Sequence, residues 1–564
     1  MFTTCMIVVL VAGMPLTSET ELVTSEDGKT VEVESGMLTV PEDRAQDNGR
    51  TISIAYYRLR STSKTPGATV FLLAGGPGAS WIDSFHKEER FREVAFYREF
   101  SDVVMFDQRG AGQSIPNLEC EGRTRIPLDQ PLTPAALRSA MRRRATSCRE
   151  HWESRGITLA AYNTDESAAD GNDLRLALGY DKIILVGGSY GSHLGLHVMR
   201  TYPGIVDRAV FYGIEGPDHT WDVPSEKLEA LRRIARVAES SPYYRDRIPE
   251  GGLIAALQAV IQRVREEPVT VEDVIVDEMA VRVASTYKAG KRSQPETWPD
   301  LILAMYNGDY SMPAKAAMAM RSLSPPSAMS NAMDFASGVS AERRSRIQSD
   351  PARDILGDIN FDYVMTEGLW NAADLGDAFR RNVVSDIPTL LVHGTWDTST
   401  PIENGREVVA SLENGHLIEV VGGTHGALYN LYEHWPPMHG LVRDFMTGQA
   451  VEFPDSVEMP PLKFPEWSTA AQTALWDAAK SGDVTALRKA ITAGADVNAL
   501  DTRRSKNGRR PLNWAAYHDR VEVIEVLLQA GADADAPNRR GKTPLDTARD
   551  KSHKGIVSLL ENTR

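Results

Sequence analysis

The sequence has few cysteines, no excess of positive charge and almost no long apolar runs. Its 564 residues include 62 Lys and Arg against 77 Asp and Glu, a formal charge of −15. This balance argues against nucleic-acid binding as the main activity, because nucleic acids recruit basic surfaces. The chain has no H-E-x-x-H motif and no cluster of metal ligands, so we expect no metal and no other cofactor.

The one strongly apolar run is M-I-V-V-L-V-A-G-M at residues 6–14, which is too short to cross a bilayer as a helix. Its length suits the apolar part of a secretory signal, and the small residues Ala12 and Gly13 stand where cleavage could occur. The segment before the run holds no Lys or Arg, so a buried strand is the alternative. We expect a signal peptide over residues 1–20, export to the periplasm or the medium, and no stable membrane span.

Three cysteines are present. Cys5 lies inside the predicted signal and would be removed with it. The remaining pair, Cys120 and Cys148, suits one disulfide in an oxidising compartment, and two unrelated buried thiols are the alternative. Because the pair and the signal support each other, we favour export.

A chain of this length favours two or more folded units. From about residue 30, short apolar strands alternate with helical segments, which predicts a largely parallel sheet covered by helices on both faces. Residues 217–385 have a mostly helical pattern, and strands return at I-P-T-L-L-V-H-G and H-L-I-E-V-V. We expect an α/β core over residues 30–216 and 386–465, with a helical cap or lid over residues 217–385.

Residues 466–564 contain an internal repeat that follows a Pro-rich stretch. Leu512 and Leu545 are 33 residues apart in matching P-L-x-x-A segments, and A-G-A-D recurs at residues 493–496 and 530–533. These features resemble ankyrin repeats, of which about three are needed for stability. We expect about three such repeats, all helical, with the last one degenerate as a cap.

The repeats differ in charge from the rest of the chain. They hold 16 basic against 13 acidic residues, so they carry +3 and the rest of the chain carries −18. Two basic clusters fall in the connections between repeats, which project as fingers from one edge of an ankyrin stack: Arg503, Arg504, Lys506, Arg509 and Arg510, then Arg539, Arg540 and Lys542. We expect this basic strip to dock on an acidic protein partner or on the acidic body of the same chain, and a merely solvated edge is the alternative.

The predicted active site centres on G-G-S-Y-G at residues 187–191, between an apolar run and a helical segment. A strand, a sharp turn and a helix are the setting of a G-x-S-x-G elbow, so we expect Ser189 to be the nucleophile. The acid and the base follow the nucleophile along the chain in this arrangement. Asp397 and His425 each follow a predicted strand, and we expect Asp397 to orient His425 as the base. Four other histidines compete for that role, but none directly follows a predicted strand: His393, His416, His434 and His439.

Acyl transfer also requires hydrogen-bond donors for the developing oxyanion. The backbone N–H of Tyr190, directly after the nucleophile, is one candidate. The Gly-rich turn A-G-G-P-G at residues 74–78 follows an earlier buried strand, where the second donor belongs. We expect the Gly76 amide to be that donor, and a simple tight turn is the alternative.

Three motifs together resemble the proline-iminopeptidase and tripeptidyl-aminopeptidase-like branch of the α/β-hydrolases. That branch carries H-G-G-P-G, D-Q-R-G-x-G-x-S and G-x-S-Y-G, which stand here at residues 74–78, 107–114 and 187–191. The resemblance covers about residues 30–465 and implies an α/β-hydrolase sheet with a helical cap insertion. It also implies a serine aminopeptidase that acts on free N-termini, and a disulfide between Cys120 and Cys148.

The sequence departs from the family pattern in one motif, because Ala74 replaces the histidine of H-G-G-P-G; this histidine is not the base. The resemblance also implies carboxylates near the cap that hold the substrate's free amine. We expect Glu215 and Glu367 in this role, and solvated or salt-bridged side chains are the alternative. The same triad would equally serve a carboxylesterase acting on small or lipid-like esters. An interaction protein with a hydrolase body is a third hypothesis.

Overall fold

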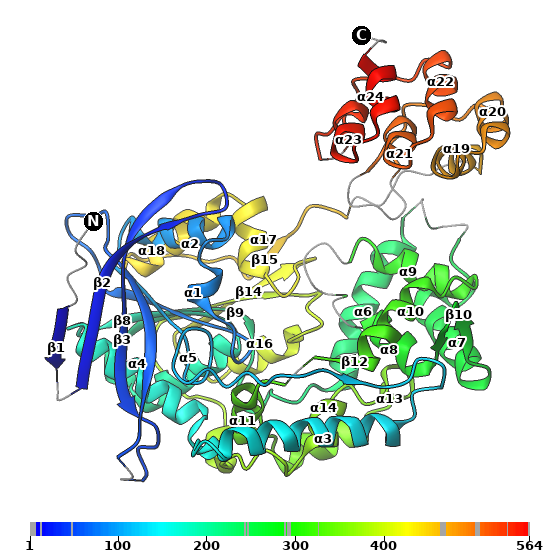
Figure 1. Cartoon of the computed structure of the whole chain (residues 1–564). Helices are drawn as coiled ribbons and strands as arrows, with labels where there is room; N and C mark the ends of the chain where they lie inside the picture. Colours follow the sequence, from blue (N-terminus) through cyan, green and yellow to red (C-terminus); the bar gives the residue numbers. More distant parts are fainter. Residues whose placement is uncertain are drawn as a thin grey trace. The chain divides into compact units, whose positions relative to one another are not determined.

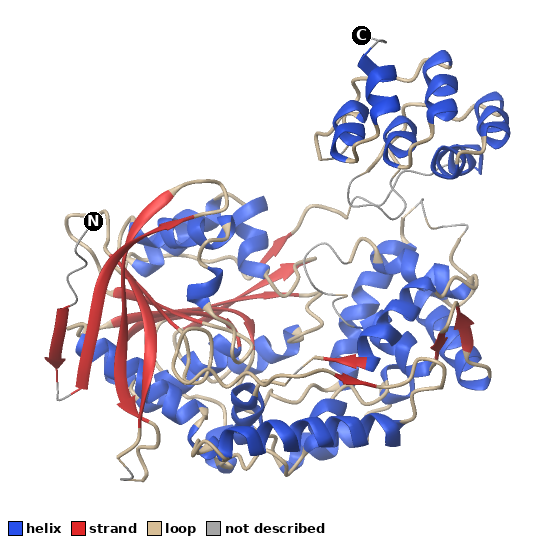
Figure 2. Ribbon diagram, in the orientation of Figure 1, coloured by secondary structure: helices blue, strands red, loops and turns tan. Residues whose placement is uncertain are grey.

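The computed structural model describes residues 7–11, 14–46, 49–241, 244, 247–286, 289, 295–324, 326–462, 470–501, 508–538 and 540–561. The chain divides into two compact units: Met1–Val237 with Pro249–Pro461, and Ala238–Ile248 with Leu462–Arg564. The first unit contains a large sheet with helices on both faces, and the C-terminal repeats belong to the second (Figures 1 and 2). Within the described residues, no helix combines the length and the apolar character needed to cross a membrane.

Eleven strands in the described residues form the sheet, in the order β1-β2-β3-β4-β6-β5-β8-β9-β13-β14-β15. The strands from β6 to β15 are parallel, whereas β1 to β4 are antiparallel and β4 joins β6 antiparallel. This mixed sheet confirms the predicted α/β class. The strands are β1 Ile7–Val11, β2 Met14–Thr24, β3 Thr30–Pro41, β4 Thr51–Leu59, β5 Thr69–Leu73, β6 Val103–Phe106, β8 Ile183–Ser189, β9 Val206–Ile214, β13 Thr389–Gly394, β14 Gly415–Val421 and β15 Ser456–Glu458.

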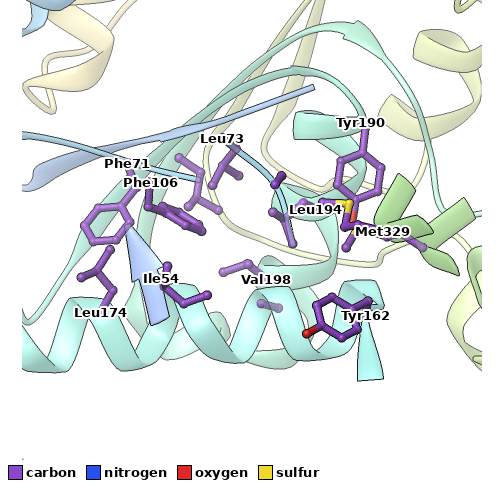
Figure 3. Packing of buried hydrophobic residues seen from close by; sticks show 14 of the residues in the cluster. Ile54, Phe71, Leu73, Phe106, Tyr162, Leu174, Tyr190, Leu194, Val198 and Met329 are labelled. Carbon is purple, nitrogen blue, oxygen red and sulfur yellow. The ribbon is translucent and has the colours of Figure 1, made fainter. Parts of the chain in front are cut away.

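Alternate residues of the central strands enter two hydrophobic cores, one on each face of the sheet. Phe71 and Phe106 pack on one face together with Leu174 (Figure 3), while Val70 and Met105 enter the other core. Burial on both faces is why these strands are apolar along their whole length. The helices that supply these cores are α3 Pro134–Glu153, α4 Thr164–Ala177, α5 Tyr190–Thr201 and α16 Ile402–Val409 on the first face, and α1 Trp81–Ser84, α2 Glu88–Arg98, α17 Ala427–His434 and α18 Pro437–Met446 on the second.

The N-terminal apolar run takes part in the sheet. Residues Ile7–Val11 form β1, which pairs antiparallel with β2, and β2 in turn pairs along β3. A strand at this place was the alternative to a secretory signal in the sequence. The signal peptide over residues 1–20 and its cleavage stay predictions.

A long insertion separates β9 from β13 and is mostly helical, as the sequence predicts. A short ladder between β7 Thr124–Arg125 and β12 Ser322–Leu323 ties it to the segment that follows the D-Q-R-G motif. The remaining strands of the insertion are β10 Val269–Val271 and β11 Val274–Val276. Its described helices are α6 Pro224–Glu239, α7 Gly252–Glu266, α8 Glu278–Thr286, α9 Trp298–Tyr306, α10 Ser311–Arg321, α11 Ala328–Ser337, α12 Ala341–Gln348, α13 Arg353–Leu356, α14 Phe361–Thr366 and α15 Gly376–Arg380.

The C-terminal repeats form helical pairs around their own apolar core, in which Leu512 and Leu545 occupy matching buried positions. In the second and third repeats, the first helix has Pro at its N-terminal end, where its missing N–H costs nothing. The pairs are α19 Ala470–Ser481 with α20 Val484–Thr492, α21 Pro511–Tyr517 with α22 Val521–Gln529, and α23 Pro544–Asp550 with α24 Lys554–Glu561.

Candidate active site

Ser189 ends strand β8 and directly precedes helix α5, in the predicted sharp turn. Its backbone has φ 55° and ψ −131°, a positive φ that only glycine adopts without strain. The neighbouring glycines are required by close packing. A Cβ at Gly187 would lie 2.6 Å from the carbonyl oxygen of Gly191, and a Cβ at Gly191 would lie 2.4 Å from that of Leu73. The turn therefore holds the serine at the carboxyl end of the sheet.

Asp397 and His425 meet at the carboxyl ends of β13 and β14. His425 Nδ1 lies 2.8 Å from Asp397 Oδ2, and Thr400 Oγ1 donates to the same oxygen at 2.8 Å. The backbone N–H groups of Ser399 and Thr400 donate to Asp397 Oδ1. Burial opposes ionisation of Asp397, but the charge of His425 and the hydrogen bonds from His393 and His425 outweigh it, so the pKa lies well below its usual value. Asp397 is thus suited to remain a carboxylate that orients His425.

The sheet brings the His425 loop close to Ser189. Strand β8 pairs with β9 so that Ser189 stands opposite Ile214. Gly213, the residue before Ile214, contacts the histidine loop: a Cβ there would lie 2.9 Å from the carbonyl oxygen of His425 and 3.0 Å from its Nδ1. A larger residue at position 213 would therefore displace His425.

The competing histidines have other contacts. His393 lies inside β13, hydrogen-bonds to the Thr400 carbonyl at 2.7 Å and approaches Asp397 to 3.4 Å. His416 bonds to the carbonyl of Pro454, and the ring of His439 stacks on that of Tyr432. The sequence had not indicated that His393 and Thr400 support Asp397, since neither belongs to a recognisable motif.

The Gly-rich turn at residues 74–78 lies against the elbow. A Cβ at Gly75 would lie 3.0 Å from the carbonyl oxygen of Gly188 and 3.4 Å from Cβ of Ser189. Gly76 has φ 116°, which excludes other residues without strain. Gly76 directly follows Gly75, the residue that contacts Ser189, and Tyr190 starts α5 directly after the nucleophile.

The D-Q-R-G motif acts as a scaffold for this turn. Gln108 Nε2 donates to the carbonyl of Ala74 at 2.9 Å, and Ser80 Oγ donates to Asp107 Oδ2 at 2.7 Å. Arg109 is fully buried and pairs with both oxygens of Asp170 at 2.8 Å. Ala74 at the start of the Gly-rich turn and Ser80 just after it are therefore both held by residues that directly follow β6.

Helix α11 of the insertion covers the same turn. Ser330 Oγ donates to the carbonyl of Pro77 at 2.8 Å, and a Cβ at Gly78 would lie 2.6 Å from Ser330 Oγ. Met329 packs against Gly110 and joins the buried cluster that contains Tyr190 (Figure 3). The insertion thus contributes directly to the walls of the candidate site.

The segment before α11 is held by the disulfide. Cys120 and Cys148 are bonded, as predicted, and join the loop after the D-Q-R-G motif to α3. The N–H of Cys120 donates to the carbonyl of Pro326, and the N–H of Ala328 donates to that of Leu118. The bridge therefore supports the backbone from which α11 starts.

Two carboxylates lie near the elbow, and one of them was predicted. Glu215 directly follows Ile214 and is 9% exposed; burial and the nearby charges of Asp334 and Asp222 raise its pKa well above the usual value. Asp334 of α11 accepts a hydrogen bond from the Tyr363 hydroxyl at 3.1 Å, and burial raises its pKa to about 7. The structure places Glu367 elsewhere, in an exposed ion pair with Arg344 at 2.7 Å. The sequence did not predict Asp334, because the surrounding segment of the helical insertion, S-N-A-M-D-F-A-S at residues 330–337, contains no recognisable motif.

Comparison with known families agrees with this geometry. Residues 68–255 match a family model described as the alpha/beta hydrolase fold, and residues 366–451 match one described as TAP-like protein. Residues 475–563 match ankyrin repeats in three copies. The chain therefore contains an α/β-hydrolase fold and, after it, ankyrin repeats. This hydrolase therefore has both predicted parts, and the two hydrolase matches stand on either side of much of the helical insertion.

This α/β-hydrolase is similar to curated proteins over part of its length. The tripeptidyl aminopeptidase of Streptomyces lividans is 30% identical over 203 residues, 34% of this chain and 37% of that protein. The tripeptidyl aminopeptidase of Streptomyces coelicolor is 30% identical over 204 residues, with the same shares. The ankyrin repeats are 33% identical to a palmitoyltransferase of Danio rerio over 90 residues, 16% of this chain and 14% of that protein. The chain thus matches little more than a third of the two aminopeptidases.

Proposed function

We propose that this hydrolase is a serine aminopeptidase in which Glu215 and Asp334 hold the substrate's ammonium group. The observation that carries the proposal is this pair of carboxylates beside the nucleophile elbow, of which Glu215 is buried and Asp334 is partly buried. Within the described residues, no Lys or Arg forms an ion pair with either one. A buried carboxylate without a cation is costly, and a substrate ammonium would supply the missing charge. The similarity to tripeptidyl aminopeptidases supports the same choice.

The proposed chemistry is acyl transfer through a covalent intermediate. The Nδ1–H of His425 donates to Asp397, so Nε2 accepts the proton of Ser189 as its oxygen attacks the scissile carbonyl. The amides of Gly76 and Tyr190 stabilise the oxyanion. His425 then gives the proton to the leaving amine, and water releases the acyl group by the reverse steps. We further propose that residues 217–385 act as a lid and that the domain limits are those predicted from the sequence.

The amine anchor is tested by comparing kcat/KM on aminoacyl-amide substrates with free and with acetylated amines. Acetylation removes the charge and should lower kcat/KM by about two orders of magnitude, since a buried charge pair contributes roughly 2–5 kcal/mol. Glu215→Gln should reduce this difference strongly. The same change at Glu367, the other predicted anchor, should leave it intact, because that side chain is engaged with Arg344 at the surface.

Equal kcat/KM values on both substrates would contradict the aminopeptidase proposal. Together with faster turnover of small esters, they would favour the carboxylesterase, which uses the same triad. Loss of the difference in Glu367→Gln but not in Glu215→Gln would move the anchor to the surface position.

We also propose that the enzyme is exported. The Cys120–Cys148 disulfide supports an oxidising compartment. N-terminal sequencing of the enzyme from the periplasm or medium should give a start within or shortly after residues 12–20. An enzyme found only in the cytoplasm, with both thiols reduced, would contradict export.

Ankyrin repeats indicate protein interaction, and we propose an acidic partner for them. Of the predicted basic strip, Arg503, Arg504, Lys506 and Arg539 lie outside the described residues. Arg509 lies 4.6 Å from the ring centre of Trp514 and 4.1 Å from that of Tyr517, Lys480 lies 4.6 Å from Trp514, and Lys551 lies 4.3 Å from Tyr517. This cluster of cations on two aromatic rings supports recognition of an acidic segment.

The partner proposal is tested with a fluorescein-labelled oligoglutamate peptide and the full chain. Binding should weaken with added salt and in Lys551→Glu. Lys554→Glu is the matched control, because Lys554 is an exposed lysine three residues further along the chain, at the start of α24. Binding that is equal in both variants, or absent in the unmodified chain, would contradict an acidic partner at this cluster.

A further inference from the structure

A chain of buried hydrogen bonds runs from the residue after the nucleophile into the insertion. The Tyr190 hydroxyl lies 2.9 Å from Thr164 Oγ1, which lies 3.3 Å from Ser337 Oγ. Ser337 Oγ lies 3.1 Å from His193 Nε2, and His193 Nδ1 lies 3.0 Å from the carbonyl of Gly216. The four side chains belong to residues that are at most 1% exposed. Buried polar groups cost free energy unless they are all paired, so the chain is a strict geometric constraint.

The donor and acceptor groups of these residues determine the direction of each hydrogen bond in this chain. A carbonyl oxygen only accepts, so Nδ1 of His193 carries the hydrogen. Burial lowers the pKa of His193 to about 3, so the ring is neutral and its Nε2 accepts from the Ser337 hydroxyl. Ser337 then accepts from Thr164, and Thr164 accepts from Tyr190. Thr164 and Ser337 each donate once and accept once, and the Tyr190 hydroxyl donates, so these partners fix the direction of each bond.

This chain of hydrogen bonds links the segments that carry Glu215 and Asp334 to the nucleophile elbow. Gly216, at one end, directly follows Glu215. Ser337 is the last residue of α11, one turn after Asp334. Tyr190, at the other end, is the first residue of α5 and follows Ser189. The rings of Tyr190 and His193 also stack, with centres 5.3 Å apart.

A second, shorter link lies in the first turn of α5. The N–H of Glu215 donates to Ser192 Oγ at 2.9 Å, and the Ser192 hydroxyl donates to the carbonyl of Ser189 at 2.6 Å. This link fixes only the backbone of Glu215. The longer chain is the one that includes α11, and hence Asp334.

We propose that Tyr190, Thr164, Ser337 and His193 are positioning residues that set the distance between the amine-binding carboxylates and Ser189. By fixing this distance they determine how far from the free N-terminus the substrate is cut, and how strongly a free amine is preferred. None of the four side chains takes part in the bond-making steps. The inference rests on the proposed aminopeptidase function, because it assumes that Glu215 and Asp334 bind the substrate's ammonium group.

Thr164 offers a matched pair of variants. Thr164→Val keeps the shape but removes the hydroxyl, which leaves the Tyr190 hydroxyl without its acceptor and Ser337 with only its bond to His193. Thr164→Ser keeps the hydroxyl and loses only a methyl group. In Thr164→Val the ratio of kcat/KM for free over acetylated amines should fall by about tenfold or more, as expected when a buried hydrogen bond is left unmade. The ratio in Thr164→Ser should remain that of the unmodified enzyme.

Two further measurements separate positioning from general stability. The rate of labelling by a small fluorophosphonate, which needs the triad but no amine anchor, should be unchanged in Thr164→Val. Ser337→Ala, which breaks the chain at the next link, should reproduce the lowered ratio. For peptides, both variants should also yield products of more than one length.

Three results would overturn the inference. The free-amine ratio could be unchanged in Thr164→Val and Ser337→Ala, or it could fall equally in Thr164→Val and Thr164→Ser. Labelling and both substrates could also be slowed by the same factor, which would indicate a structural role alone. A ratio near one in the unmodified enzyme would instead contradict the aminopeptidase proposal itself, so the two failures are distinguishable.

Discussion

At the scale of single residues, the site combines carboxylates with opposite tendencies. Asp397 is held ionised by His425 and by its other hydrogen-bond donors, whereas burial favours the protonated forms of Glu215 and Asp334. Similar groups in different surroundings can therefore serve different steps. A substrate ammonium would reverse the preference of the second pair, because it supplies the charge that ionises them.

This difference predicts a pH dependence that is specific to free amines. Burial raises the pKa of Asp334 to about 7, so this carboxyl loses its proton only as the pH approaches 7, and burial also raises the pKa of Glu215 well above its usual value. The ratio of kcat/KM for free over acetylated substrates should therefore rise from about pH 5 to 7, and fall again as the substrate amine loses its proton near pH 8. His425 affects both substrates and cancels in the ratio. A ratio that does not vary with pH would contradict the anchor.

The residues of the proposed triad could be suggested from the sequence one by one, whereas those of the proposed anchor could be suggested only in part. Ser189, Asp397 and His425 each follow a strand in a fixed chain order, so local patterns were enough to suggest them. Glu215 follows the strand next to the elbow and could be suggested in the same way. Asp334 comes from a helix of the insertion, and nothing in the local sequence says which face of that helix approaches the sheet. Glu367 illustrates the same difficulty, since the structure places it on the surface.

At the scale of elements, the position of α11 is set by its N-terminal support. The disulfide, the β7–β12 ladder and the hydrogen bond from Cys120 to Pro326 all precede this helix. The strand-turn-helix at Ser189 could be read from the sequence, because its glycines and apolar run are contiguous. The support of α11 could not, because it pairs segments about two hundred residues apart.

Removing the disulfide should therefore destabilise the hydrolase unit. Reduction, or Cys120→Ser with Cys148→Ser, should lower the free energy of unfolding by about 2–4 kcal/mol. Urea unfolding with and without reductant measures this, and the double variant should match the reduced enzyme. Two free thiols in the exported protein, found by mass spectrometry, would refute the bridge.

At the scale of the whole molecule, the catalytic groups and the repeats belong to different compact units. Every residue of the proposed triad, oxyanion pair and amine anchor lies in the first unit, and the Arg509 cluster lies in the second. The repeat pattern predicted the helical pairs well, since each repeat buries its apolar face only against its neighbours. The N-terminal run is less well determined, because a short apolar segment fits both a strand and a signal.

Ending the chain after residue 466 should leave the active site intact. The truncated hydrolase should be labelled by a fluorophosphonate at the rate of the full chain, because no catalytic group comes from the repeats. Circular dichroism provides the control for folding. A truncated protein that is folded but cannot be labelled would show that the repeats shape the site.

The central claim is that this hydrolase acts through Ser189. The most direct measurement is to label the enzyme with a fluorophosphonate and to locate the modified residue by mass spectrometry. The account predicts one modified peptide, containing Ser189, and no labelling of Ser189→Ala or of denatured enzyme, with turnover lowered by several orders of magnitude in the variant. Labelling that persists in Ser189→Ala, or modification of a different serine, would contradict it.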